Sequence, residues 1–314
     1  MLEFIFYCFI FFLGATFGSF LNVVIDRFPF NKSIFYPPSH CPHCKHKLAV
    51  LDLVPILSFL FIKGRCRYCN SRISRYYPLI ETVTGLLFTL TTYVATGNPP
   101  LSPFNKGGLL FSSPLDKGGL GGIWSAAQTG FLIYLLAIVS ILIVIFFIDL
   151  KYGIIPFKII FLGLLLITAQ LIIPCHSWPQ TRNLYQQNSW IPPLNGGITM
   201  CKTSYIFEYF ITGISTFLLF FLLFYFSKGR AIGFGDVFFS LLMGYLLGFP
   251  NIVVSVYIAF LTGAFISLIL ILARKKKFKG GTIPFGPFLV LGTITSLFWG
   301  SSIINLALLY LRGY

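Results

Sequence analysis

The sequence predicts an all-α, polytopic integral membrane protein with about eight transmembrane helices and a four-cysteine loop between the first two. Composition is the first reason, because 56% of the 314 residues are hydrophobic, only 10% are charged, and the mean hydropathy is +0.86. A soluble domain carries roughly a quarter charged residues. Length is the second reason, since several apolar runs reach the ~20 residues that cross a bilayer core as a helix. This composition excludes an ordinary soluble protein.

Eight apolar segments are predicted to span the membrane. They are 2–25, 79–96, 126–149, 154–173, 206–226, 235–249, 251–273 and 285–311. The first segment has neither a basic stretch before it nor an A-x-A cleavage site, and basic residues follow it. We therefore expect a retained first helix rather than a signal peptide.

The basic residues predict the orientation. If residues 26–78 lie in the cytoplasm, 18 of the 23 Lys and Arg fall on the inner side of the membrane. Lys and Arg accumulate in cytoplasmic loops, so we expect both termini outside. The net charge of +15 then reports topology and attraction to anionic membrane lipids, not a nucleic-acid partner.

Three parts follow from this topology: a first transmembrane helix (1–25), a cytoplasmic loop (26–78) and a transmembrane core (79–314). Outer loops near 97–125 and 174–205 interrupt the core. The first contains SPFNKGGL and its near-copy SPLDKGGL, a Gly- and Pro-rich composition that buries no core. Neither outer loop is expected to carry chemistry.

Two C-x2-C pairs in the cytoplasmic loop, CPHC (41–44) and CRYC (66–69), have the spacing of a four-cysteine zinc site. Neighbouring Lys and Arg lower thiol pKa values and favour metal-bound thiolates. Four thiolates leave no open coordination position, so the zinc is expected to be structural. The predicted ligands are Cys41, Cys44, Cys66 and Cys69.

The remaining cysteines and the nearby histidines are not expected to bind metal. His40, His43 and His46 crowd the first pair, but four cysteines already complete a tetrahedron. Cys8 lies in the first apolar span and is expected to pack as a small hydrophobic residue. Cys175 and Cys201 share an outer loop, where they either form a disulfide or stay reduced.

Two of only eight acidic residues, Asp149 and Asp236, lie at the ends of apolar spans. An intramembrane carboxylate costs ~2–3 kcal/mol or more at the bilayer centre, and it commonly marks a function. Either residue alone could equally be an interfacial group. Because successive spans cross the membrane in opposite directions, however, both residues are predicted to lie at the cytoplasmic face.

Two facing carboxylates in a site of low dielectric share one proton, so one can serve as acid and the other as base. This arrangement activates a water against an amide and protonates the leaving amine, as in aspartic proteases. Gly233 and Gly235 of GFGD allow close approach of the backbone to a substrate. The pattern Gly-x-Gly-Asp is weak alone and much stronger with a second Asp on the same side.

Five motifs in order resemble those of the type IV prepilin leader peptidases, membrane aspartyl proteases of the Gly-x-Gly-Asp type. The motifs are GSFLNVVIDRFP (18–29), the cysteine loop with its flanks (39–81), IDLKYGIIP (148–156), GFGD (233–236) and GTIPFGPFL (281–289). The resemblance covers most of the chain outside the two outer loops.

This resemblance implies that Asp149 and Asp236 are the catalytic pair of a bacterial inner-membrane enzyme. Its implied substrates are prepilins or pseudopilins, which lose a basic leader on the cytoplasmic side after a Gly. The four-cysteine loop is associated with members that then N-methylate the new N-terminal residue with S-adenosylmethionine. No Gly-rich methyltransferase signature in the sequence supports this step independently.

Three positions near the motifs leave questions open. The family commonly has an Asp after the Pro of the first Asp motif and a Lys two residues beyond the second Asp. This chain has Phe157 and Phe238 there, so we expect apolar surroundings for the pair. Glu81, a weak substrate-binding candidate, either holds the basic leader or forms an interfacial salt bridge to Arg72 or Arg75.

Two other functions are compatible with parts of the sequence. A proton-coupled transporter could use the two Asp residues as a relay, but it needs no four-cysteine loop and the chain shows no inverted repeat. A zinc-dependent scaffold for pilus assembly, without catalysis, would explain the departures at Phe157 and Phe238.

Overall fold

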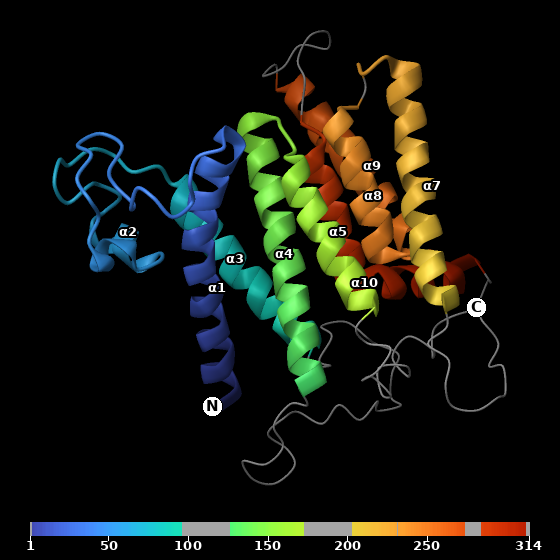
Figure 1. Ribbon diagram of the computed structural model, residues 1–314, viewed down its shortest axis with the longest axis horizontal. Helices are drawn as coiled ribbons and strands as arrows, with labels where there is room; N and C mark the ends of the chain where they lie inside the picture. Colours follow the sequence, from blue (N-terminus) through green and yellow to red (C-terminus); the bar gives the residue numbers. More distant parts are fainter. Residues whose placement is uncertain (1, 96–125, 173–202, 231, 274–283, 312–314) are drawn as a thin grey trace. The chain divides into compact units, whose positions relative to one another are not determined.

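The computed structural model describes residues 2–95, 126–172, 203–230, 232–273 and 284–311 (Figure 1). Within these ranges the regular elements are helices, and β pairing is limited to two isolated bridges. The predicted all-α class is therefore confirmed for the described residues. Outer loop 97–125, nearly all of 174–205, and the question of a Cys175–Cys201 disulfide lie outside them.

The helices share an apolar character that follows from the bilayer, where every backbone group needs an internal partner. In chain order they are α1 (Leu2–Arg27), η1 (Phe28–Phe30), η2 (Val50–Leu53), α2 (Leu57–Phe61), α3 (Tyr76–Ala95), α4 (Ala126–Tyr152), α5 (Phe157–Ile172), α7 (Thr203–Ser227), α8 (Phe234–Leu247), α9 (Asn251–Leu272) and α10 (Gly286–Leu311).

Six helices of the described part are long and apolar enough to cross a membrane: α1, α3, α4, α7, α9 and α10. Helices α5 and α8 are apolar but shorter, with 16 and 14 residues. Each predicted span coincides with one of these eight helices, and the ends differ by no more than three residues. The multi-pass character is confirmed, whereas eight full spans and the orientation stay predictions. The basic cluster at 274–279 is not among the described residues.

The chain divides into two compact units. The first contains residues 1–124 and 131–148, and the second contains residues 125–130 and 149–314. The four-cysteine loop belongs to the first unit, and both Asp149 and Asp236 belong to the second. The predicted division at residues 25 and 78 stays a prediction.

In the first unit, α1 and α3 pack closely because small residues line their contact. A Cβ atom at Gly18 would lie 2.8 Å from the Cα of Glu81, and one at Gly85 would lie 2.9 Å from the carbonyl oxygen of Phe11. Side chains join the loop end of this pair: Asn22 donates to the carbonyl oxygen of Tyr77 at 3.2 Å. The loop is thereby attached to a tightly packed helix pair.

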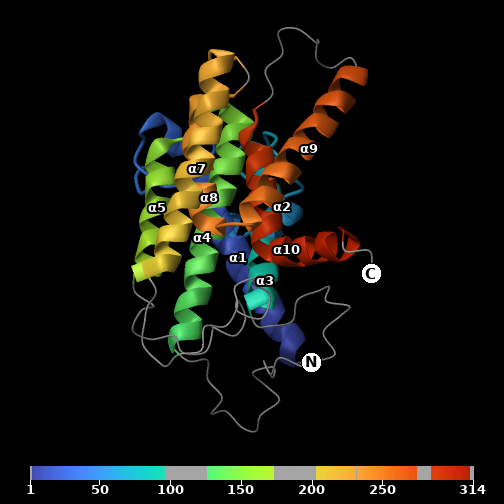
Figure 2. The same ribbon diagram turned by 90° about the vertical axis from the view of Figure 1, so that its right-hand side faces the viewer.

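In the second unit, α8 is the central helix. It packs against α7, α5, α10 and α9 (Figure 2). Val237, Phe239 and Met243 of α8 are fully buried. Helices α9 and α10 form another close pair, in which the Ser296 hydroxyl donates to the carbonyl oxygen of Asn251 at 2.6 Å. The start of α8 is therefore fixed by several neighbours.

Candidate active site and metal centre

Asp149 lies in the last turn of α4. The helix ends just beyond it, where Gly153 adopts a left-handed φ of 65° and donates its N–H to the carbonyl oxygen of Asp149 at 2.8 Å. The Asp149 residue is only 5% exposed, and its Oδ2 atom is buried with no hydrogen-bond partner among the described residues. A buried carboxylate oxygen without a partner is costly, so this atom is a candidate for binding water or substrate.

Asp236 lies in the first turn of α8 and is 7% exposed. Its Oδ2 atom accepts the N–H of Gly233 at 3.1 Å, while the Asp236 N–H donates to the Gly233 carbonyl oxygen at 3.1 Å. The carboxylate therefore caps the N-terminus of its own helix. This reciprocal contact fixes the side chain in one orientation.

The structure brings the two carboxyl groups near enough for electrostatic repulsion between them. A third element, the start of α10, meets them at Gly286, where a Cβ atom would lie 2.5 Å from Oδ2 of Asp149. The Ile155 side chain fills the space between the backbones. It would lie 3.0 Å from a Cβ at Gly235 and 3.1 Å from one at Gly286.

These contacts show that the glycines of the GFGD motif have different structural roles. Gly233 supplies an N–H to Asp236, and Gly235 leaves room for Ile155. Gly286 and Ile155 were not predicted as site residues, although both lie in quoted motifs, GTIPFGPFL and IDLKYGIIP. Within the first of these, residues 281–283 are outside the described part.

Aromatic rings cluster beside the start of α8. The rings of Phe157 and Phe238 meet edge to face, with centroids 5.1 Å apart. Phe234 lies 5.1 Å from Phe238, and Phe217 lies 5.6 Å from it, again as ring centroids. The two positions at which the resemblance implies an Asp and a Lys are thus joined here by an apolar contact.

The four predicted cysteine ligands of the loop form one cluster, in which all Sγ atoms lie within 4.8 Å of one another. The Sγ atoms of Cys41 and Cys69 are 3.8 Å apart. Zn–S bonds of about 2.3 Å place thiolates at the corners of a tetrahedron about 3.8 Å apart, so the cluster fits zinc. The cysteines are free rather than disulfide-bonded.

The two cysteine turns have the same local structure. The N–H of Lys45 donates to the Cys41 carbonyl oxygen, and the N–H of Asn70 donates to that of Cys66, both at 2.9 Å. The backbone N–H of Cys44 is the largest of the contacts that lower the pKa of the Cys41 thiol to about 6, whereas desolvation and the neighbouring thiols raise the pKa of Cys44 to about 11. A thiolate at neutral pH is the form that binds a metal.

Two of the three histidines beside the first turn have contacts elsewhere. His40 contacts the Pro38 carbonyl oxygen at 3.0 Å, and the His46 ring lies against Tyr68. Among the described residues, the metal-binding cluster contains the four cysteines alone. That no histidine is a ligand stays a prediction.

Glu81 does not form the salt bridge that was considered for it, and its role in binding the basic leader stays a prediction. The residue is 8% exposed, and its carboxylate accepts the backbone N–H of Ile56 at 2.7 Å. Ser19 of α1 also hydrogen-bonds to it. The ion pair found in the cysteine loop joins Arg67 and Asp52, and none joins Glu81 to Arg72 or Arg75 among the described residues, so the expected bridge is wrong.

The regions of the chain that contain these features match models of known protein families. A family model described as the bacterial Peptidase A24 N-terminal domain matches residues 12–95, and one described as the type IV leader peptidase family matches residues 136–268. The chain belongs to the type IV leader peptidase family. The first match contains the four cysteines, and the second contains both aspartates. The predicted recognition is confirmed, as is the enzyme class, a leader peptidase.

Two relatives resemble the chain over nearly its full length, and a third is more similar over a shorter segment. A prepilin leader peptidase/N-methyltransferase of Bacillus subtilis is 27% identical over 297 residues, 94% of this chain and 95% of that protein. One of Legionella pneumophila is 28% identical over 312 residues, 92% and 89% of the two chains. One of Myxococcus xanthus is 52% identical over 84 residues, 27% of this chain and 25% of that protein. No solved structure matches the chain.

Proposed function

We propose that the protein is a prepilin peptidase in which Asp149 and Asp236 form the catalytic pair. It removes the basic leader from prepilin or pseudopilin-like proteins at the cytoplasmic face of a bacterial inner membrane. The main support is that two buried carboxylates, from α4 and α8, lie close enough to interact electrostatically, and that Oδ2 of Asp149 has no hydrogen-bond partner among the described residues. Membership of a leader peptidase family supplies the class of substrate.

The pair holds one proton between its two carboxyl groups, because both cannot ionise cheaply at close range. The ionised group takes a proton from a water, which attacks the scissile carbonyl carbon. The protonated group donates to the nitrogen of the leaving amine. Gly233 holds Asp236 in place through its N–H, and Oδ2 of Asp149, which has no hydrogen-bond partner among the described residues, binds the reacting water.

A second reaction follows cleavage. Relatives that match nearly the whole chain carry the name prepilin leader peptidase/N-methyltransferase. We therefore assign N-methylation of the new N-terminal residue to this protein. S-adenosylmethionine supplies the methyl group when bound, and we assign no described residue to that donor.

Zinc has a structural place in this scheme. The residues Cys41, Cys44, Cys66 and Cys69 supply four thiolates at tetrahedral spacing, and they leave no position for a substrate. The metal therefore holds the loop in shape. Both termini lie on the outer side of the inner membrane, and the loop and the aspartate pair lie at the cytoplasmic face.

The test is leader removal from a co-expressed prepilin. We expect Asp149→Asn and Asp236→Asn each to lower the cleavage rate by about 10² to 10⁴-fold, the range for loss of a general acid or base. Glu3→Gln, a charge removal in the other unit, serves as the control and leaves cleavage unchanged. Cleavage by both Asn variants would show that the pair is assigned wrongly.

The same experiment separates the alternatives. A wild-type protein that is folded and zinc-loaded but inert would favour the scaffold without catalysis. Mass measurement of the mature prepilin reveals whether its N-terminus carries an added methyl group. A mature substrate without that group would contradict the assignment of the second reaction.

A further inference from the structure

The stretch between the two cysteine turns, Val50–Phe61, is apolar and exposed. Its sequence is VLDLVPILSFLF, and it forms η2 and α2. Val50 is 83% exposed and Phe61 is 82% exposed, and Leu51 and Leu60 are also exposed. A contiguous apolar surface of this kind on a polar loop marks an interaction site rather than a surface in water.

Glu81 holds this stretch beside the helices instead of beyond their ends. The Ile56 N–H donates to Glu81 at 2.7 Å, and Glu81 lies five residues inside the start of α3 at Tyr76. At 1.5 Å per residue, that is roughly 8 Å along the helix. In both views α2 lies level with the shaft of α1 (Figures 1 and 2).

The start of α3 has the composition of a membrane–water boundary. Arg75, Tyr76 and Tyr77 stand there in succession, and aromatic and basic residues are typical of this level. Ile56, held roughly 8 Å deeper than Tyr76 along the helix, is then at the depth where amphipathic helices rest, about 5–10 Å into the headgroup and acyl boundary.

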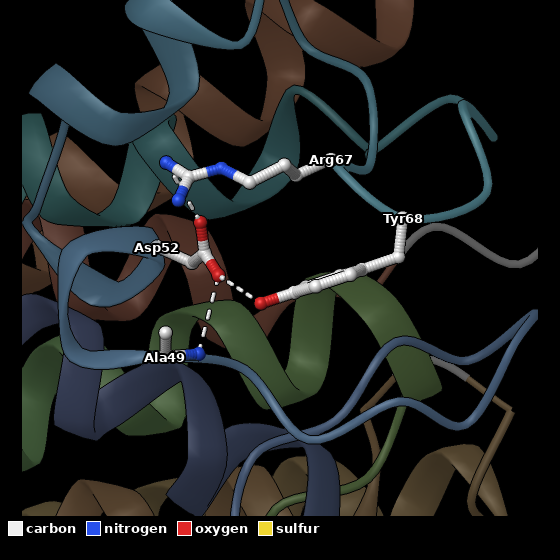
Figure 3. A network of polar contacts seen from close by, with 4 residues as sticks. All are labelled: Ala49, Asp52, Arg67 and Tyr68. Carbon is white, nitrogen blue, oxygen red and sulfur yellow. Dashed lines mark hydrogen bonds and ion pairs between the residues drawn. The ribbon is translucent and has the colours of Figure 1, made fainter.

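The single acid of the stretch does not oppose contact with lipid. The Asp52 side chain is 4% exposed, and its carboxylate faces Arg67 at 3.1 Å. It also accepts the Ala49 N–H at 3.1 Å and the Tyr68 hydroxyl at 3.4 Å (Figure 3). Because Arg67 and Tyr68 belong to the second cysteine turn, the same contacts connect the stretch to the metal centre.

The positive charge that flanks Val50–Phe61 indicates which partner this surface binds. Exposed basic residues flank it on both sides: Lys45, Lys47, Lys63 and Arg65. Basic residues near a membrane surface are attracted by anionic headgroups. The other apolar partner in this system, a prepilin, carries a basic leader that these residues would repel. Charge complementarity therefore favours lipid.

We propose that Val50–Phe61 is a membrane-interface anchor, held at its depth by Glu81, that inserts its exposed apolar side chains into an anionic bilayer. Lys63 and Arg65 then contact the headgroups. The four-cysteine hairpin thus lies along the membrane surface instead of extending into the cytoplasm. This inference does not depend on the aspartate pair or on leader cleavage.

A photoreactive amino acid in place of Phe61 tests the anchor. The full-length protein is reconstituted in bilayer discs that contain phosphatidylglycerol and phosphatidylethanolamine, illuminated, and examined by mass spectrometry. A matched sample carries the same amino acid in place of Asn31, an exposed turn residue outside the cysteine hairpin and the flanking basic residues. We expect several-fold more lipid adduct at position 61 than at position 31.

Each other outcome overturns the proposal. Equal lipid adducts at the two positions would place the stretch in water. Adducts at position 61 to an added prepilin, or within the chain itself, in place of lipid would identify another partner. Zinc content, measured on the same samples, verifies that the loop is folded.

The contact with Glu81 is tested in the same samples. Glu81→Gln keeps an oxygen that can accept the Ile56 N–H, whereas Glu81→Leu removes it. We expect lipid adducts at position 61 to persist in the Gln variant and to fall several-fold in the Leu variant. Adducts as abundant in both would show that Glu81 does not hold the anchor.

Discussion

At the scale of single residues, a glycine controls the approach of α10 to Asp149. Any side chain at Gly286 would place its Cβ atom 2.5 Å from the Oδ2 atom of Asp149 and 3.1 Å from Ile155. One of these neighbours would have to move. If Asp149 is catalytic, the displacement acts on the reacting oxygen itself.

We therefore expect Gly286→Ala to lower the rate of leader cleavage by about 10²-fold, the typical cost of misplacing a reacting group by about 1 Å. The substrate's KM should change little, because the leader and helix still bind. Steady-state cleavage of a prepilin in detergent micelles measures both constants.

Gly292→Ala is the matched control on the same helix. A Cβ there would collide with the Ser255 carbonyl oxygen, away from the carboxylates. Gly292→Ala should lower the midpoint of thermal unfolding at least as much as Gly286→Ala does. Its loss of turnover number should be smaller. Equal losses of turnover number in both variants would show a purely structural role for Gly286.

Phe157 and Phe238 are a second residue-scale feature, because their rings replace the Asp and Lys that the resemblance implies. An edge-to-face aromatic pair contributes about 0.5–1.5 kcal/mol beyond its buried area. We expect Phe157→Asp and Phe238→Lys each to lower the midpoint of thermal unfolding. The double variant should recover part of this loss, since an opposite-charge pair then occupies the same contact.

Thermal unfolding of the purified protein in one detergent measures this cycle. Phe226→Lys, at an exposed position near the end of α7, controls for a Lys on the surface and should change the midpoint little. If the decrease in unfolding midpoint of the double variant equalled the sum of the two single decreases, the two positions would not interact.

At the scale of elements, the four-cysteine hairpin is held from two directions. The four cysteines bring its two turns together at a spacing that fits a metal, and the contacts of Asp52 with Arg67 and Tyr68 join the second turn to η2 (Figure 3). Glu81 then attaches the start of α2 to α3. Loss of the metal should therefore loosen the hairpin without unfolding α1 and α3, whose glycine-lined contact is separate.

Metal removal tests this view. We expect about one zinc per chain in the purified protein, and Cys66→Ser should abolish it, because three thiolates bind far less tightly than four. Cleavage of residues 28–75 by an added protease should become faster. Cys8→Ser, in α1 and outside the cluster, should keep both the zinc and the resistance to protease. Full zinc content in Cys66→Ser would contradict the ligand set.

At the scale of the whole molecule, the unequal distribution of Lys and Arg predicts the orientation. Alkaline phosphatase folds only outside the cytoplasm and reports the side on which it lies. Fused after Tyr314, it should be active in intact cells. Inserted after Asn31, an exposed turn residue with φ 54°, it should be inactive. A fluorescent protein that folds only inside should give the opposite result, and a reversed pattern would overturn the orientation.

The sequence alone was sufficient to predict the apolar helices and the cluster of four cysteine thiols. Long apolar runs must be helical in lipid, because no water is present to satisfy the backbone, and six such helices are confirmed. The spacing of the C-x2-C pairs predicted a cluster that the structure contains. Both are local properties, so they can be read without knowing which elements meet.

Contacts between distant segments depended on tertiary packing. Nothing local relates Gly286 to Asp149, or Ile56 to Glu81, because each contact joins residues that are far apart in the chain and is set by how closely two backbones approach. Glu81 illustrates the difference: arginines nearby in the sequence suggested an ion pair, but in the folded chain its carboxylate accepts the backbone N–H of Ile56. The exposed surface of Val50–Phe61 likewise emerges only from the fold, because an apolar stretch in sequence looks the same whether it is buried or exposed.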